Sequence, residues 1–297
     1  MGLHPITLLV SLLGAVAAAF TGLWTASLVR LRRRSRAAGE GGLGVPRPLE
    51  VLTGAVTMFF DTLGIGAFAP TTALIRFLRL APDAWIPGTL NVGHSLASIL
   101  ESFIYTAIIP VDAATLILTV VAATVGAWLG AGVVARWPKR RVQLGMGFAL
   151  LAAAGFMLLR QLELFPAGGD ALGLDGWRLG LAVAGHLLLG ALMTLGIGLF
   201  APCMILLSFL GMSAKAIFPI MMTSCAFLMP IGGLQFIRQG SYAPRLSLAL
   251  TLGGLPAVCL AAFVVKELPL YALRWMVLGV VTYAGAMLLR AGAKQEA

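Results

Sequence analysis

The sequence predicts an all-α integral membrane protein with two inverted-topology repeats. Each repeat is a broken or re-entrant helix followed by three transmembrane helices, and one extra transmembrane helix precedes them. The first observation is composition: of 297 residues, 60% are hydrophobic and 11% are charged, whereas soluble domains carry about 25% charged residues. Apolar runs of about 20 residues recur along the chain, as in membrane-spanning helices. These runs are continuous rather than alternating, which disfavours a β-barrel.

The second observation is a duplicated string. Residues 61–70 read DTLGIGAFAP and residues 193–202 read MTLGIGLFAP, so eight of ten positions agree at an offset of 132. With the same offset and no gap, residues 46–160 align with residues 178–292, and each apolar segment falls on another. The matching order of segments indicates an internal duplication.

The N-terminal segment predicts a retained helix. Residues 6–29 are a longer apolar run than a signal peptide contains, and the basic cluster Arg30–Arg36 follows the run instead of preceding it. We therefore expect residues 1–45 to form a transmembrane helix and a basic cytoplasmic loop.

The rest of the chain divides into repeat A (46–160), an extracytoplasmic linker (161–177) and repeat B (178–292). In each repeat the broken segment comes first, at 49–80 and at 178–212. Three unbroken spans are expected after each. These are 85–109, 112–135 and 142–160 in repeat A, and 215–237, 244–266 and 270–290 in repeat B.

Loop charge decides between two topologies. If each broken segment returns to its own side, most of the 21 lysine and arginine residues lie on one side, including the cluster 136–141. If both segments cross fully, that cluster falls on the other side. Because basic loops stay in the cytoplasm, we expect re-entrant segments, inverted repeats, an outside N-terminus and a cytoplasmic C-terminus in the cell (plasma or inner) membrane.

Glycine and proline at the two breaks predict a binding site. Proline costs a helix interior ~3 kcal/mol, and in lipid the freed backbone groups are tolerated only where protein or water satisfies them. Two facing half-helix N-termini would offer unpaired N–H groups to an anion. Simple kinks are the alternative, but two copies at equivalent places favour a site. The predicted substrate-binding residues are Gly64, Gly66, Pro70, Thr71, Thr72, Gly196, Gly198, Pro202, Cys203 and Asn91.

The string GIGxFAP, present once in each half of a chain of this length, resembles the TauE/SafE family of sulfite exporters. The resemblance covers residues 50–290 and rests on the glycines and prolines of the two strings. It implies a membrane permease that exports or imports sulfite, organosulfonates or related sulfur anions.

Three ionisable residues inside apolar segments are candidates for proton coupling. Asp61 lies beside the first break, and an ionised carboxylate at the bilayer centre costs at least ~2.5 kcal/mol. His94 and Glu101 lie on a polar stripe of the segment 85–109. Met193 replaces Asp61 in the second copy, so a carboxylate role there is confined to one half. The alternative reading is backbone capping by Asp61 and an interhelical hydrogen bond from His94.

The expected function is that of a secondary transporter that exports small sulfur-containing anions. The partners expected are a small anionic substrate and the lipid bilayer, with a homo-oligomer left open. No cofactor or metal is expected. Nucleic acid is not expected either, because basic cytoplasmic loops account for the net charge of +10. An anion channel and an intramembrane sulfur-transfer enzyme that uses Cys203 are the alternatives. The chain lacks a P-loop string and the HExxH and GxSxG strings.

Overall fold

The structure is a computed structural model of the chain, and it describes residues 5–38, 44–164, 168–196, 198–263 and 270–294. Every regular element in these ranges is helical. Six helices are long and apolar enough to cross a membrane. The fold is therefore that of a helical, membrane-embedded protein, as composition predicts.

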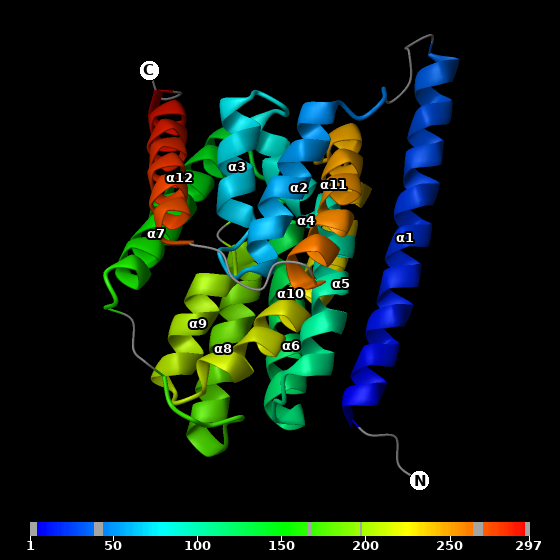
Figure 1. Ribbon diagram of the computed structural model, residues 1–297. Coiled ribbons are helices and arrows are strands. Elements are labelled where there is room, and N and C mark those ends of the chain that lie inside the picture. Colours follow the sequence, from blue (N-terminus) through cyan, green and yellow to red (C-terminus); the bar gives the residue numbers. More distant parts are fainter. Residues whose placement is uncertain (1–4, 39–43, 165–167, 197, 264–269, 295–297) are drawn as a thin grey trace.

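The first helix, α1 (Pro5–Ala37), lies at the edge of the bundle (Figure 1). It extends beyond the predicted span and includes the basic cluster in its last turns. Phe20 and Trp24 attach it to the bundle, since they are buried together with Val92 and Tyr242. Leu9 and Leu13 of the same helix are buried as well, whereas Leu8, Leu12, Leu23 and Val29 are exposed.

Both predicted breaks are present. The first lies between α2 (Pro48–Thr62) and α3 (Phe68–Phe77), and the second lies between α8 (Gly176–Met193) and α9 (Phe200–Phe209). Each break holds two glycines with positive φ, at +83° and +93° for Gly64 and Gly66 and at +91° and +73° for Gly196 and Gly198. Other residues rarely adopt this conformation, so the glycines explain why the helices end there.

The predicted span 85–109 is wrong in one respect. A short 3₁₀ turn, η1 (Asp83–Trp85), leads into α4 (Ile86–Gly93), and α5 (Ser95–Ile108) follows after an interruption at His94. Ser95 Oγ donates to the Asn91 carbonyl at 2.5 Å. Short polar side chains compete in this way with helical backbone pairing, and apolar periodicity does not reveal it.

The remaining helices follow the predicted order. They are α6 (Ala113–Val134), α7 (Lys139–Gln161), α10 (Ala214–Gln239), α11 (Pro244–Phe263) and α12 (Leu270–Ala293). Asp112 caps α6 by accepting the Thr115 N–H at 2.8 Å, and Ser213 caps α10 by accepting the Ala216 N–H at 3.3 Å. The predicted end of the span 244–266 lies partly outside the described residues.

Helices from the two halves pack on one another at glycines. Helix α2 packs on α11, and α8 packs on α6. A Cβ added to Gly126 would overlap the Leu187 carbonyl oxygen, and one added to Gly190 would overlap the Ala123 carbonyl oxygen. The α6–α8 backbones are therefore in contact, and small residues such as Gly126 and Gly130 allow this close approach in membrane helices.

Hydrogen bonds between neighbouring helix ends and connections show that many of these ends lie on one face, which we call the basic face. Arg245 at the start of α11 donates to Glu50 at the start of α2 at 2.7 Å, and Arg140 in α7 donates to the Gly292 carbonyl in α12 at 3.2 Å. Ser241 donates to the Ala135 carbonyl at 2.9 Å. The helix ends and connections at this face carry the basic residues Arg34, Arg36, Arg47, Arg76, Arg79, Arg136, Lys139, Arg140, Arg141, Arg238, Arg245 and Arg290.

The opposite face joins a different set of ends. The N–H of Asp112, before α6, donates to the Leu172 carbonyl at 2.9 Å, and the N–H of Gly169, in the linker, donates to the Met212 carbonyl at 3.1 Å. Helices α2 and α3 occupy one half of the view in Figure 1, and α8 and α9 occupy the other.

Candidate functional site

The two breaks meet at the centre of the bundle. A Cβ added to Gly198 would lie 3.5 Å from Cβ of Phe68, and a Cβ added to Gly66 would lie 3.9 Å from Cδ2 of Phe200. Each phenylalanine is the first residue of its half-helix. Segments that are 132 positions apart in the sequence therefore face each other directly.

A cavity of about 40 Å³ lies at this meeting point. That volume exceeds the roughly 10–15 Å³ that one ordered water requires. Equivalent positions of the two strings line it, and α5, α7 and α10 complete the wall. The lining residues are Asp61, Ile65, Gly66, Ala67, Phe68, Ala69, His94, Ser98, Ala153, Met157, Met193, Gly198, Leu199, Phe200, Ala201, Cys225 and Met229.

Both half-helices start at the cavity. The first intrahelical bond of α3 runs from the Thr71 N–H to the Ala67 carbonyl at 2.9 Å, and that of α9 runs from the Cys203 N–H to the Leu199 carbonyl at 3.0 Å. Amides that precede such a bond have no partner within their helix. Pro70 and Pro202 occupy the first turns, where the missing N–H has no intrahelical role. The first turn of each half-helix therefore presents amide groups at the cavity.

Asp61 occupies part of this donor set. Its carboxyl group accepts the backbone N–H of Ala67, and it also lies within hydrogen-bonding reach of the carboxyl group of Glu101. Asp61 is 6% exposed and Glu101 is fully buried. Two ionised carboxylates at this separation repel each other strongly, so a shared proton or a bound cation has to stabilise the pair.

The Thr62 hydroxyl connects Glu101 to α2. The Thr62 hydroxyl lies 2.8 Å from the Met58 carbonyl oxygen and 2.7 Å from Glu101 Oε1, but it has only one hydrogen to donate. If Thr62 donates to Met58, the contact with Glu101 needs a protonated carboxyl group as donor. The Tyr105 hydroxyl donates to the Thr62 carbonyl and links this group to α5.

His94 lies at the interruption between α4 and α5 and lines the cavity. Thr71 Oγ1 donates to the Ala67 carbonyl at 2.7 Å and lies 3.1 Å from His94 Nε2. If Thr71 gives its one hydrogen to Ala67, His94 donates from Nε2 to the Thr71 oxygen. His94 Nδ1 is buried without a partner among the described residues, and in that tautomer it is a free acceptor.

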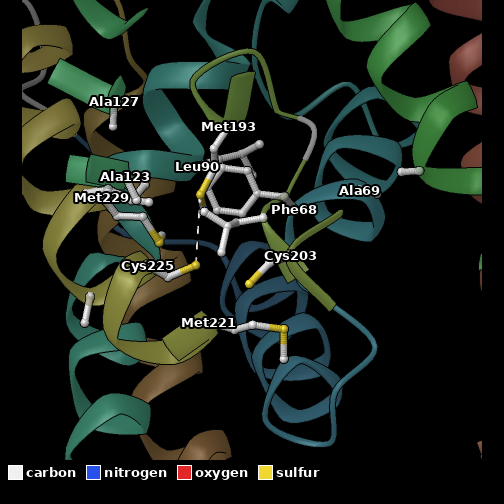
Figure 2. Packing of buried hydrophobic residues seen from close by; sticks show 14 of the residues in the cluster. Phe68, Ala69, Leu90, Ala123, Ala127, Met193, Cys203, Met221, Cys225 and Met229 are labelled. Atoms are coloured by element: carbon white, nitrogen blue, oxygen red, sulfur yellow. Dashed lines mark hydrogen bonds between the residues drawn. The ribbon is translucent and has the colours of Figure 1, made fainter. Parts of the chain in front are cut away.

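Sulfur atoms form much of the remaining wall. Met157, Met193, Cys225 and Met229 line the cavity, and the Cys225 thiol lies 4.0 Å from the Met193 sulfur. Figure 2 shows the sulfurs of Met193, Cys225 and Met229 near those of Cys203 and Met221. Sequence reasoning assigned no role to Met193, Cys225 or Met229. Among these sulfur-containing residues, only Met193 had a signal in the sequence, because it aligns with Asp61.

Of the ten predicted substrate-binding residues, Gly66 and Gly198 line the cavity. The other eight lie outside its lining: Gly64, Pro70, Thr71, Thr72, Asn91, Gly196, Pro202 and Cys203. Asn91 donates from Nδ2 to the Pro87 carbonyl at 2.8 Å, and its Oδ1 is buried without a partner in the described chain. Thr72 is buried, with its hydroxyl unpartnered among the same residues. Cys203 lies 3.3 Å from His186 Nε2, and His186 Nδ1 donates to the Ala182 carbonyl at 2.7 Å. Sequence reasoning missed this buried Cys–His pair, whose two members are 17 positions apart.

In the described ranges, no group of three or more His, Cys, Asp or Glu side chains could hold a metal ion.

The fold and the cavity define the class as a helical membrane protein with a central cavity between two broken helices. Comparison with family models, with curated proteins and with solved structures gave no match.

Proposed function

We propose that this chain is a secondary membrane transporter of small anions, with sulfur oxyanions such as sulfite or organosulfonates as the substrate class. The observation that carries the proposal is the central cavity. There the half-helices α3 and α9, which follow two breaks of nearly identical sequence, begin face to face. Interrupted helices at equivalent positions of two halves are typical of transporter binding sites.

The proposal includes inverted repeats and re-entrant hairpins. The start of α2 is bonded to Arg245, and the end of α3 is bonded to α12 through Arg76, so both ends of this hairpin belong to the basic face. Both ends of the α8–α9 hairpin belong to the opposite face. Cytoplasmic loops carry the excess of lysine and arginine, so we assign the basic face to the cytoplasm.

The chemistry of the cavity supports an anion that arrives with a proton. The half-helix amides supply hydrogen-bond donors and positive potential. The carboxyl group of Asp61 would repel an anion unless it is protonated. Binding of the anion together with a proton on the Asp61–Glu101 pair therefore avoids an uncompensated charge within the membrane. Polarizable thioether and thiol groups at the wall suit a polarizable sulfur oxyanion.

The test is uptake by the purified chain in proteoliposomes. We expect uptake of labelled sulfite, thiosulfate or sulfoacetate above that of acetate, and faster uptake when unlabelled substrate is preloaded inside. A channel would give no acceleration from preloading. Absence of saturable uptake for every anion in the panel contradicts the proposal.

The sulfur-transfer alternative uses Cys203, which pairs with His186 outside the cavity lining. Cys203→Thr reproduces the residue at the equivalent position of the first half, Thr71. We expect transport to survive this substitution, and its loss would favour the enzyme.

A further inference from the structure

A second cavity, separate from the transport site, lies at the basic face. Its volume is about 590 Å³, and it is bounded by the C-terminal end of α3, by η1, by the start of α7 and by α12. The lining residues are Ala73, Arg76, Phe77, Arg79, Ala81, Pro82, Asp83, Lys139, Tyr283, Ala284 and Met287.

The charge of this cavity is positive. One acid, Asp83, faces three bases. Asp83 already accepts from Arg76 at 2.5 Å and from Gln143 Nε2 at 2.6 Å. Arg79 and Lys139 are exposed, and neither has an ion-pair partner in the described part of the chain. Two cationic groups therefore remain available to an anionic ligand.

Arg79 occupies a backbone position that favours glycine. Its φ is +53°, and the following N–H of Leu80 donates to the Ile75 carbonyl at 2.9 Å. The equivalent turn after α9 has the same bond, from the Met212 N–H to the Leu207 carbonyl at 3.0 Å, and it has Gly211 at φ +96°. A long side chain in this conformation carries backbone strain that glycine avoids. The strain at Arg79 fits a role for its guanidinium group.

The charges are also confined to one half of the duplicated scaffold. At the offset of 132, Arg76 corresponds to Ser208, Arg79 to Gly211, and Lys139 to Tyr271. The repeat architecture therefore does not require these basic residues, and they distinguish the basic face from the opposite one.

The cavity is amphipathic. Apolar side chains stand beside the cations, and Phe77, Tyr283 and Met287 are 71%, 60% and 36% exposed on the bundle surface. In a bilayer this surface faces acyl chains. A ligand with an anionic head and apolar tails fits both parts of the lining, whereas a free anion uses only the cations.

We infer that this cavity binds the phosphate head of an anionic phospholipid, with Arg79 and Lys139 as its cationic ligands and α3 and α12 beside its acyl chains. Basic pockets between helices on the cytoplasmic side of a membrane bind anionic head groups in this way. The site does not depend on which solute the central cavity carries.

The test is lipid binding to the full chain in neutral detergent, with phosphatidylglycerol compared with phosphatidylcholine. Native mass spectrometry counts the bound lipid, and a thermal melt measures the stabilisation. We expect phosphatidylglycerol to be preferred, with apparent affinity falling about fivefold for each cation removed, in Arg79→Gly and in Lys139→Gln. Because glycine fits the backbone at residue 79, Arg79→Gly should not lower the lipid-free Tm.

Arg141→Gln is the matched control, because Arg141 is an exposed base of the same face outside the cavity. It should retain the full preference for phosphatidylglycerol. Three results overturn the inference: equal stabilisation by both lipids, an unchanged preference in both cavity variants, or inorganic phosphate that stabilises the lipid-free chain as much as phosphatidylglycerol does.

Discussion

Asp61, Glu101 and His94 are the residues at which the proposed chemistry is decided. Asp61 caps the first half-helix through the Ala67 N–H and also contacts Glu101. Asp61 therefore makes both contacts that the sequence left as alternatives: it bonds nearby backbone, and it forms a carboxyl pair that could hold a coupling proton. His94 adds an unpartnered ring nitrogen, Nδ1, at the cavity wall.

Replacing the carboxyl groups tests proton coupling. We expect Asp61→Asn and Glu101→Gln each to abolish the stimulation of anion uptake by an acidic outside medium, while exchange of labelled for unlabelled substrate persists. An amide keeps the shape of the group but cannot release a proton in this pH range. The measurement is uptake with and without an imposed pH gradient.

Asp170→Asn is the control for these variants, because Asp170 is an exposed acid of the linker. It should respond to the gradient like the parent protein. A normal pH response in both Asp61→Asn and Glu101→Gln rejects the coupling role.

Among the elements, the broken hairpins combine conformational freedom at the break with tight packing along their length. Four glycines with positive φ end and restart the helices, and the backbone contacts of α2 with α11 and of α8 with α6 hold the hairpins in place. Glycine therefore serves two different purposes in the same element.

Gly198→Ala isolates the first purpose. The added methyl group would lie 3.5 Å from Phe68 Cβ, an ordinary contact, so the expected effect is the strain of φ +73°, about 1–2 kcal/mol. We expect a lower Tm in detergent and reduced anion uptake. Gly180→Ala, in α8 and with open space around it, should change neither. An undiminished Tm and uptake in Gly198→Ala would show that the break does not need glycine there.

Gly126→Ala isolates the second purpose. Its methyl group would overlap the Leu187 carbonyl oxygen, which forces α6 and α8 apart at a cost of about 1–3 kcal/mol. The expected result is a lower Tm, measured in the same detergent. Gly132→Ala is the matched control, because Gly132 is in the same helix with nothing within 4 Å of an added Cβ. Equal Tm values for the two variants would contradict the packing described for these helices.

At the scale of the whole molecule, the relation of the two hairpins to the membrane determines how the cavity is reached. If the hairpins enter from opposite faces, each side of the membrane reaches the cavity through a different half of the chain. If the two halves exchanged conformations, access to the cavity would move from one face of the membrane to the other, as in other transporters with inverted repeats.

Single cysteines in a cysteine-free background test this arrangement in intact cells. We expect a membrane-impermeant maleimide to label Asp170→Cys and Lys215→Cys directly, and Ala38→Cys and Arg79→Cys only after permeabilisation. All four positions are exposed. If α2 and α3 together crossed the bilayer, residues 38 and 79 would be labelled from opposite sides, and the re-entrant arrangement would be wrong.

The sequence by itself determined the membrane class, the order of the helices and the positions of both breaks. These follow from local physics, because apolar runs, glycine and proline act on the backbone of their own segment. Sequence also marked Asp61, Glu101 and His94, since charged and polar residues are conspicuous in apolar runs.

Only the tertiary structure decided which side chains meet. Asp61 and Glu101 are forty positions apart, Cys203 turns toward His186 instead of the cavity, and Met193 and Cys225 stand at the cavity wall. The interruption at His94 also became visible only in three dimensions. Such contacts depend on the rotation and separation of neighbouring helices, which close packing at glycines such as Gly126 and Gly190 sets, and no local pattern in the sequence encodes them.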